Sequence, residues 1–201
     1  MMPLLSVLFA YLLGAIPFGY LLVRWKTGGD IRTSGSGNIG ATNVLRTTGI
    51  VAGVVTLILD IAKGYFAVWV ADRASLGSPF WTSLAALAVM AGHAYPIFLG
   101  FKGGKAVSSF IGAFLRLAPL ATIAMLVVFV AVVAKTRYIS LGSIIAAATF
   151  PIAVWLILQP PVEIELAAFA ASIFVIYRHR ANIRRLQEGS EHVLRFGARR
   201  A

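Results

Sequence analysis

Long apolar stretches alternate along this chain with shorter polar segments that are rich in glycine, lysine and arginine. A helix that crosses a bilayer needs about 20 predominantly apolar residues. Most of the apolar stretches have this length, so the pattern predicts an all-α integral membrane protein. The apolar stretches cover residues 4–23, 50–71, 80–99, 106–134, 139–158 and 162–177.

One stretch, residues 106–134, is longer than a single crossing and contains Arg116 and Pro119. Because proline breaks a helix, we expect the chain to turn at this point. With this turn the glycine-rich and the basic segments all lie on one side of the membrane, as the positive-inside rule requires of a cytoplasmic face. The pattern therefore predicts seven transmembrane helical segments, two of them short. The N-terminus would lie outside, on the periplasmic side, and the C-terminus in the cytoplasm.

Composition supports a single membrane domain over residues 1–201. The chain is 59% hydrophobic and has a mean hydropathy of +0.86, which is too apolar for a soluble globule. Its net charge of +11 indicates basic cytoplasmic loops, a basic cytoplasmic tail over residues 178–201 and contact with anionic membrane lipid, not nucleic acid. The N-terminal residues lack the charged segment of a signal peptide, so we expect the first helix to be retained.

The chain contains no cysteine and only three histidines. The missing cysteines exclude a disulfide framework, a thiol nucleophile and a Cys-ligated metal site. The histidines lie far apart and do not have the spacing of metal ligands. We therefore expect no metal site.

The first polar segment holds the sequence GSGNIGATN at residues 35–43, and Arg46 follows three positions later. Glycines allow the backbone to approach a ligand, and successive N–H groups in such a loop can form an anion-binding concavity. Arg46 adds a guanidinium fork suited to phosphate or carboxylate. The segment predicts a phosphate site at the membrane surface, and the alternative is a flexible linker. Its formal G-x-G-x-x-G match lacks the strand that a dinucleotide-binding fold requires.

The second polar segment holds KGGK at residues 102–105, directly before an apolar helix. Backbone N–H groups at the start of a helix, together with two ammonium groups, favour an anion. The alternative is a basic turn that contacts lipid headgroups. The surrounding sequence does not match the phosphate loop of nucleotide-binding proteins, so it does not imply a nucleotide.

Polar side chains within the apolar stretches form a further set of candidates. His93 lies inside a predicted span, where a histidine indicates a functional site, with a structural role as the alternative. Asp60 and Lys63 are three positions apart on one helical face, so we expect an ion pair. An ion pathway is the alternative for this pair.

The last candidates lie at helix ends near basic residues. Ser140 and Ser143 open the predicted helix at residues 139–158, where capping of the helix is the alternative role. His179 and Asn182 are three positions apart and point the same way on a continued helix. The alternative for this arginine-rich segment is binding to anionic lipid.

Five motifs in this order resemble the bacterial glycerol-3-phosphate acyltransferases that use acyl phosphate, the PlsY family. The resemblance covers nearly the whole chain, and the sequence DxxKG at residues 60–64 fits it as well. The departures are small: Ala106 and Ser108-Ser109 replace residues that are commonly Gly and Ala-Thr in the family. The motifs are GSGNIGATNxxR at 35–46, GHxYP at 92–96, FKGGK at 101–105, SLxS at 140–143 and YRHRxNI at 177–183.

The resemblance implies a multi-pass enzyme of the bacterial inner membrane with its active site at the cytoplasmic face. It would transfer a fatty acyl group from acyl phosphate to the 1-hydroxyl of sn-glycerol 3-phosphate. The products would be 1-acyl-sn-glycerol 3-phosphate (lysophosphatidic acid) and inorganic phosphate, in the first acylation step of phospholipid biosynthesis. The resemblance also implies functional coupling to the enzyme that produces acyl phosphate, and no cofactor.

The resemblance assigns roles to residues by motif. Glycerol 3-phosphate would contact Ser36, Arg46, Lys105, Ser143, His179 and Asn182. Acyl phosphate would contact Gly37, Asn38, Gly40, Ala41, Thr42, Asn43, Gly103 and Gly104. The residues expected to act in catalysis are His179, Asn182, Lys105, Ser36 and His93.

The residues agree with this chemistry but leave the general base open. Acyl phosphate is already activated, so orientation and charge stabilisation could suffice without a covalent intermediate. The proton of the glycerol hydroxyl could go to His179, whose reference pKa is about 6.5, to His93, or to a phosphate oxygen of the substrate. A transporter of small organophosphates is the competing function, although the chain shows none of the inverted repeats common in transporters.

Overall fold

The computed structural model describes residues 1–194 and contains there ten α-helices and two short 3₁₀ helices, with no β-strand. The predicted all-α class is confirmed. The elements are α1 (Met2–Ala15), α2 (Phe18–Thr27), η1 (Ile31–Thr33), α3 (Ala41–Thr48), α4 (Ile50–Ala74), α5 (Pro79–Ala94), η2 (Ile97–Leu99), α6 (Val107–Leu117), α7 (Pro119–Thr136), α8 (Ile139–Leu158), α9 (Val162–Arg178) and α10 (Arg180–Gln187).

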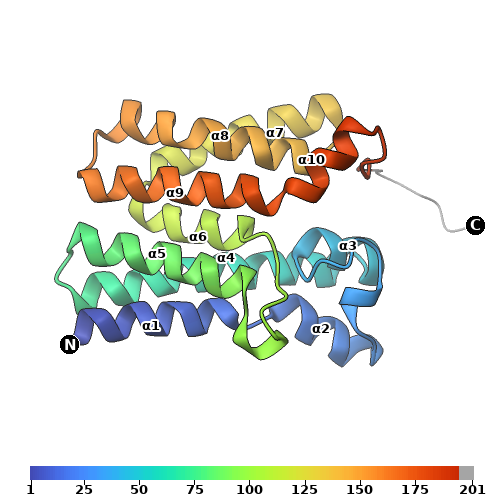
Figure 1. The fold of residues 1–201 in the computed structure, drawn as a ribbon, viewed down its shortest axis with the longest axis horizontal. Helices are drawn as coiled ribbons and strands as arrows, with labels where there is room; N and C mark the ends of the chain where they lie inside the picture. The colour runs from blue at the N-terminus through green and yellow to red at the C-terminus, as the bar shows by residue number, and fades with distance from the viewer. Residues whose placement is uncertain (195–201) are drawn as a thin grey trace, which may run out of the picture.

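The long helices lie side by side and run in alternating directions (Figure 1). The N-terminus and the connections α4–α5 and α8–α9 lie at one end of the bundle. The other end, which we call the polar end, carries α2, α3, the segment 100–106 and α10. Both candidate phosphate segments of the sequence therefore meet at the same end of the molecule.

Five helical segments of the described chain are long and apolar enough to cross a membrane. The helices α6 and α9, with 11 and 17 residues, are shorter than these. The sequence predicted two short segments between residues 106 and 134, but only α6 is short. Pro119 occupies the first turn of the next helix, where proline is tolerated, so α7 keeps 18 residues. The five segments are Met2–Thr27, Ile50–Ala74, Pro79–Leu99, Pro119–Thr136 and Ile139–Leu158.

Two helix pairs pack with their backbones in direct contact. A side-chain carbon added at Gly14 of α1 or Gly92 of α5 would overlap a carbonyl oxygen of the other helix. The same holds between α4 and α6, at Gly64 and Gly112. Close contact through small residues is how helices associate in membranes, where lipid gives no hydrophobic drive between them. These four glycines therefore fix α1 on α5 and α4 on α6.

Aromatic side chains join α6 to α8 at the centre of the bundle. The rings of Phe110, Phe114 and Phe150 are at most 2% exposed, and their centroids lie 4.8 to 4.9 Å apart. Such aromatic clusters add packing specificity to the apolar area that they bury. On the outer surface, Val127 and Trp155 are more than 60% exposed, which suits contact with lipid.

A buried ion pair stabilises the break between α1 and α2. Pro17 separates these helices, and Lys63 Nζ donates a hydrogen bond to the Ile16 carbonyl oxygen at 2.9 Å. The same ammonium group lies 2.8 Å from Asp60 Oδ1, and both side chains are 2% exposed. His93 Nδ1 lies 3.6 Å from this Asp60 oxygen. The predicted pairing of Asp60 with Lys63 is confirmed, and it ties α4 to the start of α2.

We expect Lys63→Met to destabilise the protein strongly. The substitution leaves the Asp60 carboxylate buried without its cation, which typically costs about 3–5 kcal/mol. Thermal unfolding of the detergent-solubilised protein should show a clearly lower melting temperature. As a control, Arg184→Gln breaks the Arg184–Glu188 pair, whose side chains are 80% and 51% exposed, and should change the melting temperature little. Equal melting temperatures for the two variants would contradict this account of the buried pair.

Candidate functional site

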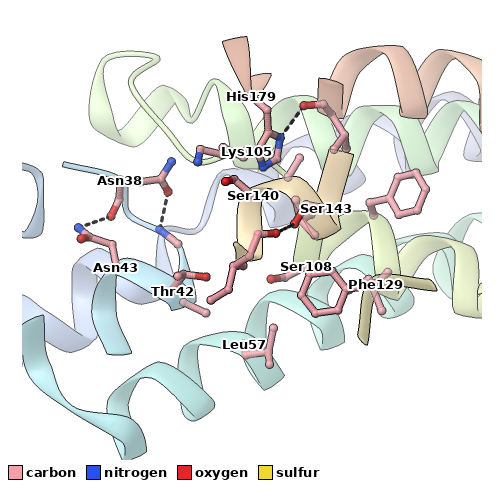
Figure 2. A pocket seen from close by; sticks show the side chains of 18 of the residues that line it. Asn38, Thr42, Asn43, Leu57, Lys105, Ser108, Phe129, Ser140, Ser143 and His179 are labelled. Carbon is pink, nitrogen blue, oxygen red and sulfur yellow. Dashed lines mark hydrogen bonds between the residues drawn. The ribbon is translucent and has the colours of Figure 1, made fainter. Parts of the chain in front are cut away.

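A cavity of about 490 Å³ opens at the polar end and is lined by residues from α3, α4, α6, α7, α8 and α10. Figure 2 shows the polar side chains of Asn38, Lys105 and His179 on one part of its wall. Leu57 of α4 and Phe129 of α7 lie on another part. The cavity therefore joins a polar region to an apolar groove.

The side chain of Asn43 holds the glycine-rich loop together. It is 2% exposed, and its Oδ1 accepts a hydrogen bond from the Ser36 N–H at 2.9 Å. Its Nδ2 donates to the carbonyl oxygens of Asn38 at 2.8 Å and Ser34 at 3.0 Å. These bonds occupy the polar atoms of Asn43, the residue that was predicted to contact acyl phosphate. Asn43 thus shapes the loop from within.

The loop leads into the N-terminus of α3 at the cavity wall. Asn38 Oδ1 accepts a hydrogen bond from the Gly40 N–H at 2.8 Å, which positions the chain before the helix (Figure 2). The next N–H groups, those of Ala41 and Thr42, begin α3 and have no acceptor within their own helix. Gly40, Ala41 and Thr42 all line the cavity. This helix start is suited to an anionic ligand.

Gly103 and Gly104 dock the basic segment onto α5. Their N–H groups donate to the carbonyl oxygens of Ala94 at 3.2 Å and His93 at 3.0 Å. Their carbonyl oxygens accept hydrogen bonds from the Arg178 guanidinium, which lies 2.8 Å from that of Gly104. A side-chain carbon at Gly104 would collide with the His93 ring. The expected role of these glycines as N–H donors to phosphate is therefore replaced by a role in placing the segment.

The basic segment at 102–105 places Lys105 in the wall of the cavity. Burial lowers the pKa of the Lys105 ammonium to about 8. The nearby guanidinium groups of Arg185 and Arg46 contribute to this lowering of the pKa, and the Glu191 carboxylate partly opposes it. An anionic ligand would favour the charged form of Lys105. The cavity therefore holds an ammonium group that an anion would stabilise.

His179 lies between α9 and α10 and is 2% exposed. Burial and the positive charge of Lys105 lower the pKa of His179 to about 4, so the ring is neutral near pH 7. Its Nδ1 lies 2.8 Å from the Val175 carbonyl oxygen. Since a carbonyl only accepts, Nδ1 carries the hydrogen of the neutral ring and Nε2 is an acceptor. This pKa lies well below the reference value of about 6.5 that made His179 a candidate for the general base.

Glu191 lines the cavity, although it belongs to none of the sequence motifs. Its Oε1 accepts hydrogen bonds from Asn182 Nδ2 at 2.8 Å and Ser140 Oγ at 3.0 Å, and its Oε2 accepts one from Arg185 Nε at 2.8 Å. Burial raises the pKa of Glu191, but the hydrogen bonds from Asn182, Arg185 and Ser140 hold it below its usual value. A single carboxylate thus lies among several cations.

Most of the predicted site residues meet at this cavity. Gly37, Gly103 and Gly104 do not line it. Among residues 1–194, no group of three His, Asp or Glu side chains could hold a metal ion. The predicted residues that line the cavity are Ser36, Asn38, Gly40, Ala41, Thr42, Asn43, Arg46, His93, Lys105, Ser143, His179 and Asn182.

The apolar part of the cavity lies between α4, α6 and α7. Leu57 of α4 is 38% exposed, so the groove wall reaches the outer surface of the bundle. Ser108 contributes a hydroxyl group to this otherwise apolar wall. The groove is suited to a hydrocarbon chain whose polar end lies near Lys105. Its apolar lining includes Val54, Leu57, Ile61, Phe110, Ile111, Leu115, Met125, Leu126 and Phe129.

We expect anion binding at this cavity to weaken as the pH rises through 8. Lys105 is charged below its pKa of about 8 and loses its proton above it, so the attraction is present at pH 7 and lost at higher pH. Sulfate is a suitable probe because its charge is constant in this range. Calorimetry in detergent should show about a tenfold weaker affinity at pH 9.5 than at pH 7. Lys105→Arg should remove this pH dependence, and a dependence that persists in that variant would contradict the assignment.

Comparison with known proteins agrees with this geometry. The family described as glycerol-3-phosphate acyltransferase matches residues 4–189. The chain is 49% identical over 183 residues to the glycerol-3-phosphate acyltransferase of Geobacter sulfurreducens, covering 91% of this chain and 93% of the relative. It is 48% identical over 191 residues to glycerol-3-phosphate acyltransferase 2 of Moorella thermoacetica, covering 95% and 97%.

Solved structures give the same result. The chain resembles the crystal structure of PlsY (YgiH), an integral membrane glycerol 3-phosphate acyltransferase, in its glycerol 3-phosphate form. The TM-score is 0.91 at 39% identity, covering 98% of this chain and 96% of the other. The lysophosphatidic acid form of PlsY gives a TM-score of 0.88 at 38% identity over the same shares of the two chains. With its motifs, its helical fold and its relatives in agreement, this chain belongs to the PlsY family of integral membrane glycerol-3-phosphate acyltransferases.

Proposed function

We propose that this protein transfers a fatty acyl group from acyl phosphate to the 1-hydroxyl of sn-glycerol 3-phosphate. The products are 1-acyl-sn-glycerol 3-phosphate and inorganic phosphate, in the first acylation step of phospholipid biosynthesis. The observation that carries the proposal is one cavity that combines a cationic region with an apolar groove. Both substrates carry phosphate and one carries a long hydrocarbon chain. The family membership supports acyl transfer over the transport of organophosphates.

Glycerol 3-phosphate binds in the polar part of the cavity. Arg46 and Lys105 hold its phosphate, because a guanidinium fork and an ammonium group are the side chains best suited to that group. Ser36 and Ser143, which also line the cavity, supply hydroxyl groups around it. His179 and Asn182 face the glycerol part of the molecule.

Acyl phosphate binds where the glycine-rich loop enters α3. The N–H groups of Ala41 and Thr42 hold its phosphate, with the Asn38 amide beside them. Asn43, like Gly37, contributes through the shape of the loop. The fatty chain of acyl phosphate lies in the groove between α4, α6 and α7.

The basic segment contributes by its placement. Gly103 and Gly104 carry no phosphate contact in this proposal, because their N–H groups are bonded to carbonyl oxygens of α5. The His93 ring packs directly against Gly104 and thereby positions Lys105. His93 is in this proposal a positioning residue of the site.

The reaction then needs orientation and charge stabilisation. The oxygen of the 1-hydroxyl attacks the acyl carbonyl carbon, and the bond from that carbon to the phosphate oxygen breaks. The proton goes to a phosphate oxygen, since the second pKa of a phosphate monoester is about 6 and that of His179 is about 4. His179 Nε2 orients the hydroxyl by accepting its hydrogen bond. Lys105 and the N–H groups of α3 stabilise the negative charge that develops.

The proposal includes the membrane arrangement. The chain forms one domain with seven crossings of the bacterial inner membrane, in which α6 and α9 are the shortest, and the polar end faces the cytoplasm. The tail from residue 178 lies on that side, although residues 195–201 are outside the described part of the chain. Functional coupling to the enzyme that produces acyl phosphate follows from this choice of donor.

We expect the purified protein to form lysophosphatidic acid and release phosphate when given palmitoyl phosphate and glycerol 3-phosphate. Mass spectrometry of the lipid product and a phosphate assay would measure this turnover. Lys105→Ala should lower kcat/KM by at least about 100-fold, because the site loses a cation at the phosphate. Lys102→Ala is the matched control, since Lys102 is exposed and does not line the cavity, and it should leave kcat/KM nearly unchanged.

Two results would contradict parts of this proposal. Turnover with acyl-CoA or acyl-carrier protein, and none with acyl phosphate, would contradict the proposed acyl donor. Full activity of Lys105→Ala would contradict the proposed role of Lys105 in binding phosphate.

The cysteine-free sequence allows a direct test of the topology. We expect single cysteines at Ser34, Lys102 and Ser190, which are all exposed, to react with a membrane-impermeant thiol reagent from the cytoplasmic side only. A cysteine at Leu76, in the connection between α4 and α5, should react from the outside of intact cells. Labelling in intact cells and in inverted vesicles distinguishes the two sides. External labelling at Lys102 would contradict the proposed arrangement.

A further inference from the structure

The amide group of Asn182 has one bonded and one unbonded polar atom. Asn182 lines the cavity and is 4% exposed. Its Nδ2 donates to Glu191 Oε1 at 2.8 Å, whereas its Oδ1 is buried and has no hydrogen-bond partner among residues 1–194. Buried polar atoms in native proteins are nearly always paired. An unpaired acceptor on a residue of a ligand cavity indicates that its donor comes from the ligand.

Glu191 determines which side of the amide carries this acceptor. A carboxylate only accepts hydrogen bonds, so the NH₂ group of Asn182 must face Glu191 and Oδ1 must face away from it. Glu191 is itself fixed, because Ser140 Oγ donates to it at 3.0 Å and Arg185 Nε at 2.8 Å. If the Asn182 amide turned over, two acceptors would meet and the hydrogen bond between Asn182 and Glu191 would be lost.

We propose that Glu191 is a positioning residue that fixes the Asn182 amide, and that Asn182 Oδ1 accepts a hydrogen bond from the 2-hydroxyl of glycerol 3-phosphate. This inference rests on the proposed function. The reacting 1-hydroxyl must lose its proton, and an amide oxygen is too weak a base to assist. The neutral His179, whose Nε2 is an acceptor, is suited to that hydroxyl. The amide oxygen is suited to the hydroxyl that keeps its proton.

The arrangement makes the protein selective for an acceptor with a 2-hydroxyl group. An analogue without this group, 3-hydroxypropyl phosphate, leaves Asn182 Oδ1 unpaired in the complex. Dihydroxyacetone phosphate places a second acceptor opposite it. Sites built to bond a hydroxyl reject analogues that lack it, because their buried polar atoms stay unpaired.

The test compares kcat/KM for glycerol 3-phosphate with kcat/KM for 3-hydroxypropyl phosphate, using the same acyl donor. The unaltered protein should prefer glycerol 3-phosphate. Glu191→Gln and Asn182→Ala should each reduce this preference about fivefold to tenfold, the usual effect of one hydrogen bond. Adding Glu191→Gln to Asn182→Ala should reduce it no further, because Glu191 acts through the amide.

The matched control is Glu188→Gln. Glu188 lies three positions earlier, pairs with the exposed Arg184 and does not line the cavity, so the same chemical change should leave the preference unaltered. A purely structural role of Glu191 would lower kcat/KM equally for both acceptors. An unchanged ratio in Glu191→Gln or in Asn182→Ala would therefore overturn the inference.

Two further outcomes are also decisive. If Glu191→Gln does not insert into the membrane, the ratio of kcat/KM for the two acceptors is measured in Asn182→Ala alone. That variant leaves the bonds of Glu191 to Ser140 and Arg185 in place, so an unchanged ratio there overturns the inference. If the unaltered protein forms no lysophosphatidic acid from glycerol 3-phosphate and acyl phosphate, the proposed function fails and the inference falls with it. Activity with an unchanged ratio contradicts the inference alone.

Discussion

The site depends on one constraint: polar backbone and charged groups that are buried in the protein must find their partners within it. The basic segment at 102–105 meets this constraint through α5, whose last carbonyl oxygens accept the Gly103 and Gly104 N–H groups. Arg178 then bonds their carbonyl oxygens from α9. At the break after α1, Lys63 donates a hydrogen bond to the Ile16 carbonyl oxygen and pairs with Asp60. Satisfying these groups also determines where Lys105 lies.

The Glu191 carboxylate partly offsets the positive charges that line the cavity. Lys105, Arg46 and Arg185 repel one another, and Glu191 reduces that repulsion. His179 remains neutral, so it adds no further positive charge. Donors and cations that are already held in place in a buried site are suited to stabilising negative charge.

Much of this arrangement could be predicted from the sequence, because span length, proline and basic residues are local signals. They indicated the helices, the turn at Pro119 and the common face of the polar motifs. The spacing of residues could not show that Asn43 bonds its own loop or that the Gly104 N–H is already occupied. Nor could it indicate Glu191, whose segment folds back so that the Leu194 N–H bonds the Arg137 carbonyl at 2.8 Å. Such contacts are visible only in three dimensions.

The backbone contacts between α1 and α5 and between α4 and α6 restrict how this protein can be engineered. Replacing a helical glycine by alanine normally stabilises a protein, because it restricts the unfolded chain. At Gly14, Gly64, Gly92 and Gly112 the added carbon would instead overlap a carbonyl oxygen and push the helices apart. Stabilised variants are therefore to be sought among the outward-facing side chains of α7 and α8, such as the exposed Val127 and Trp155.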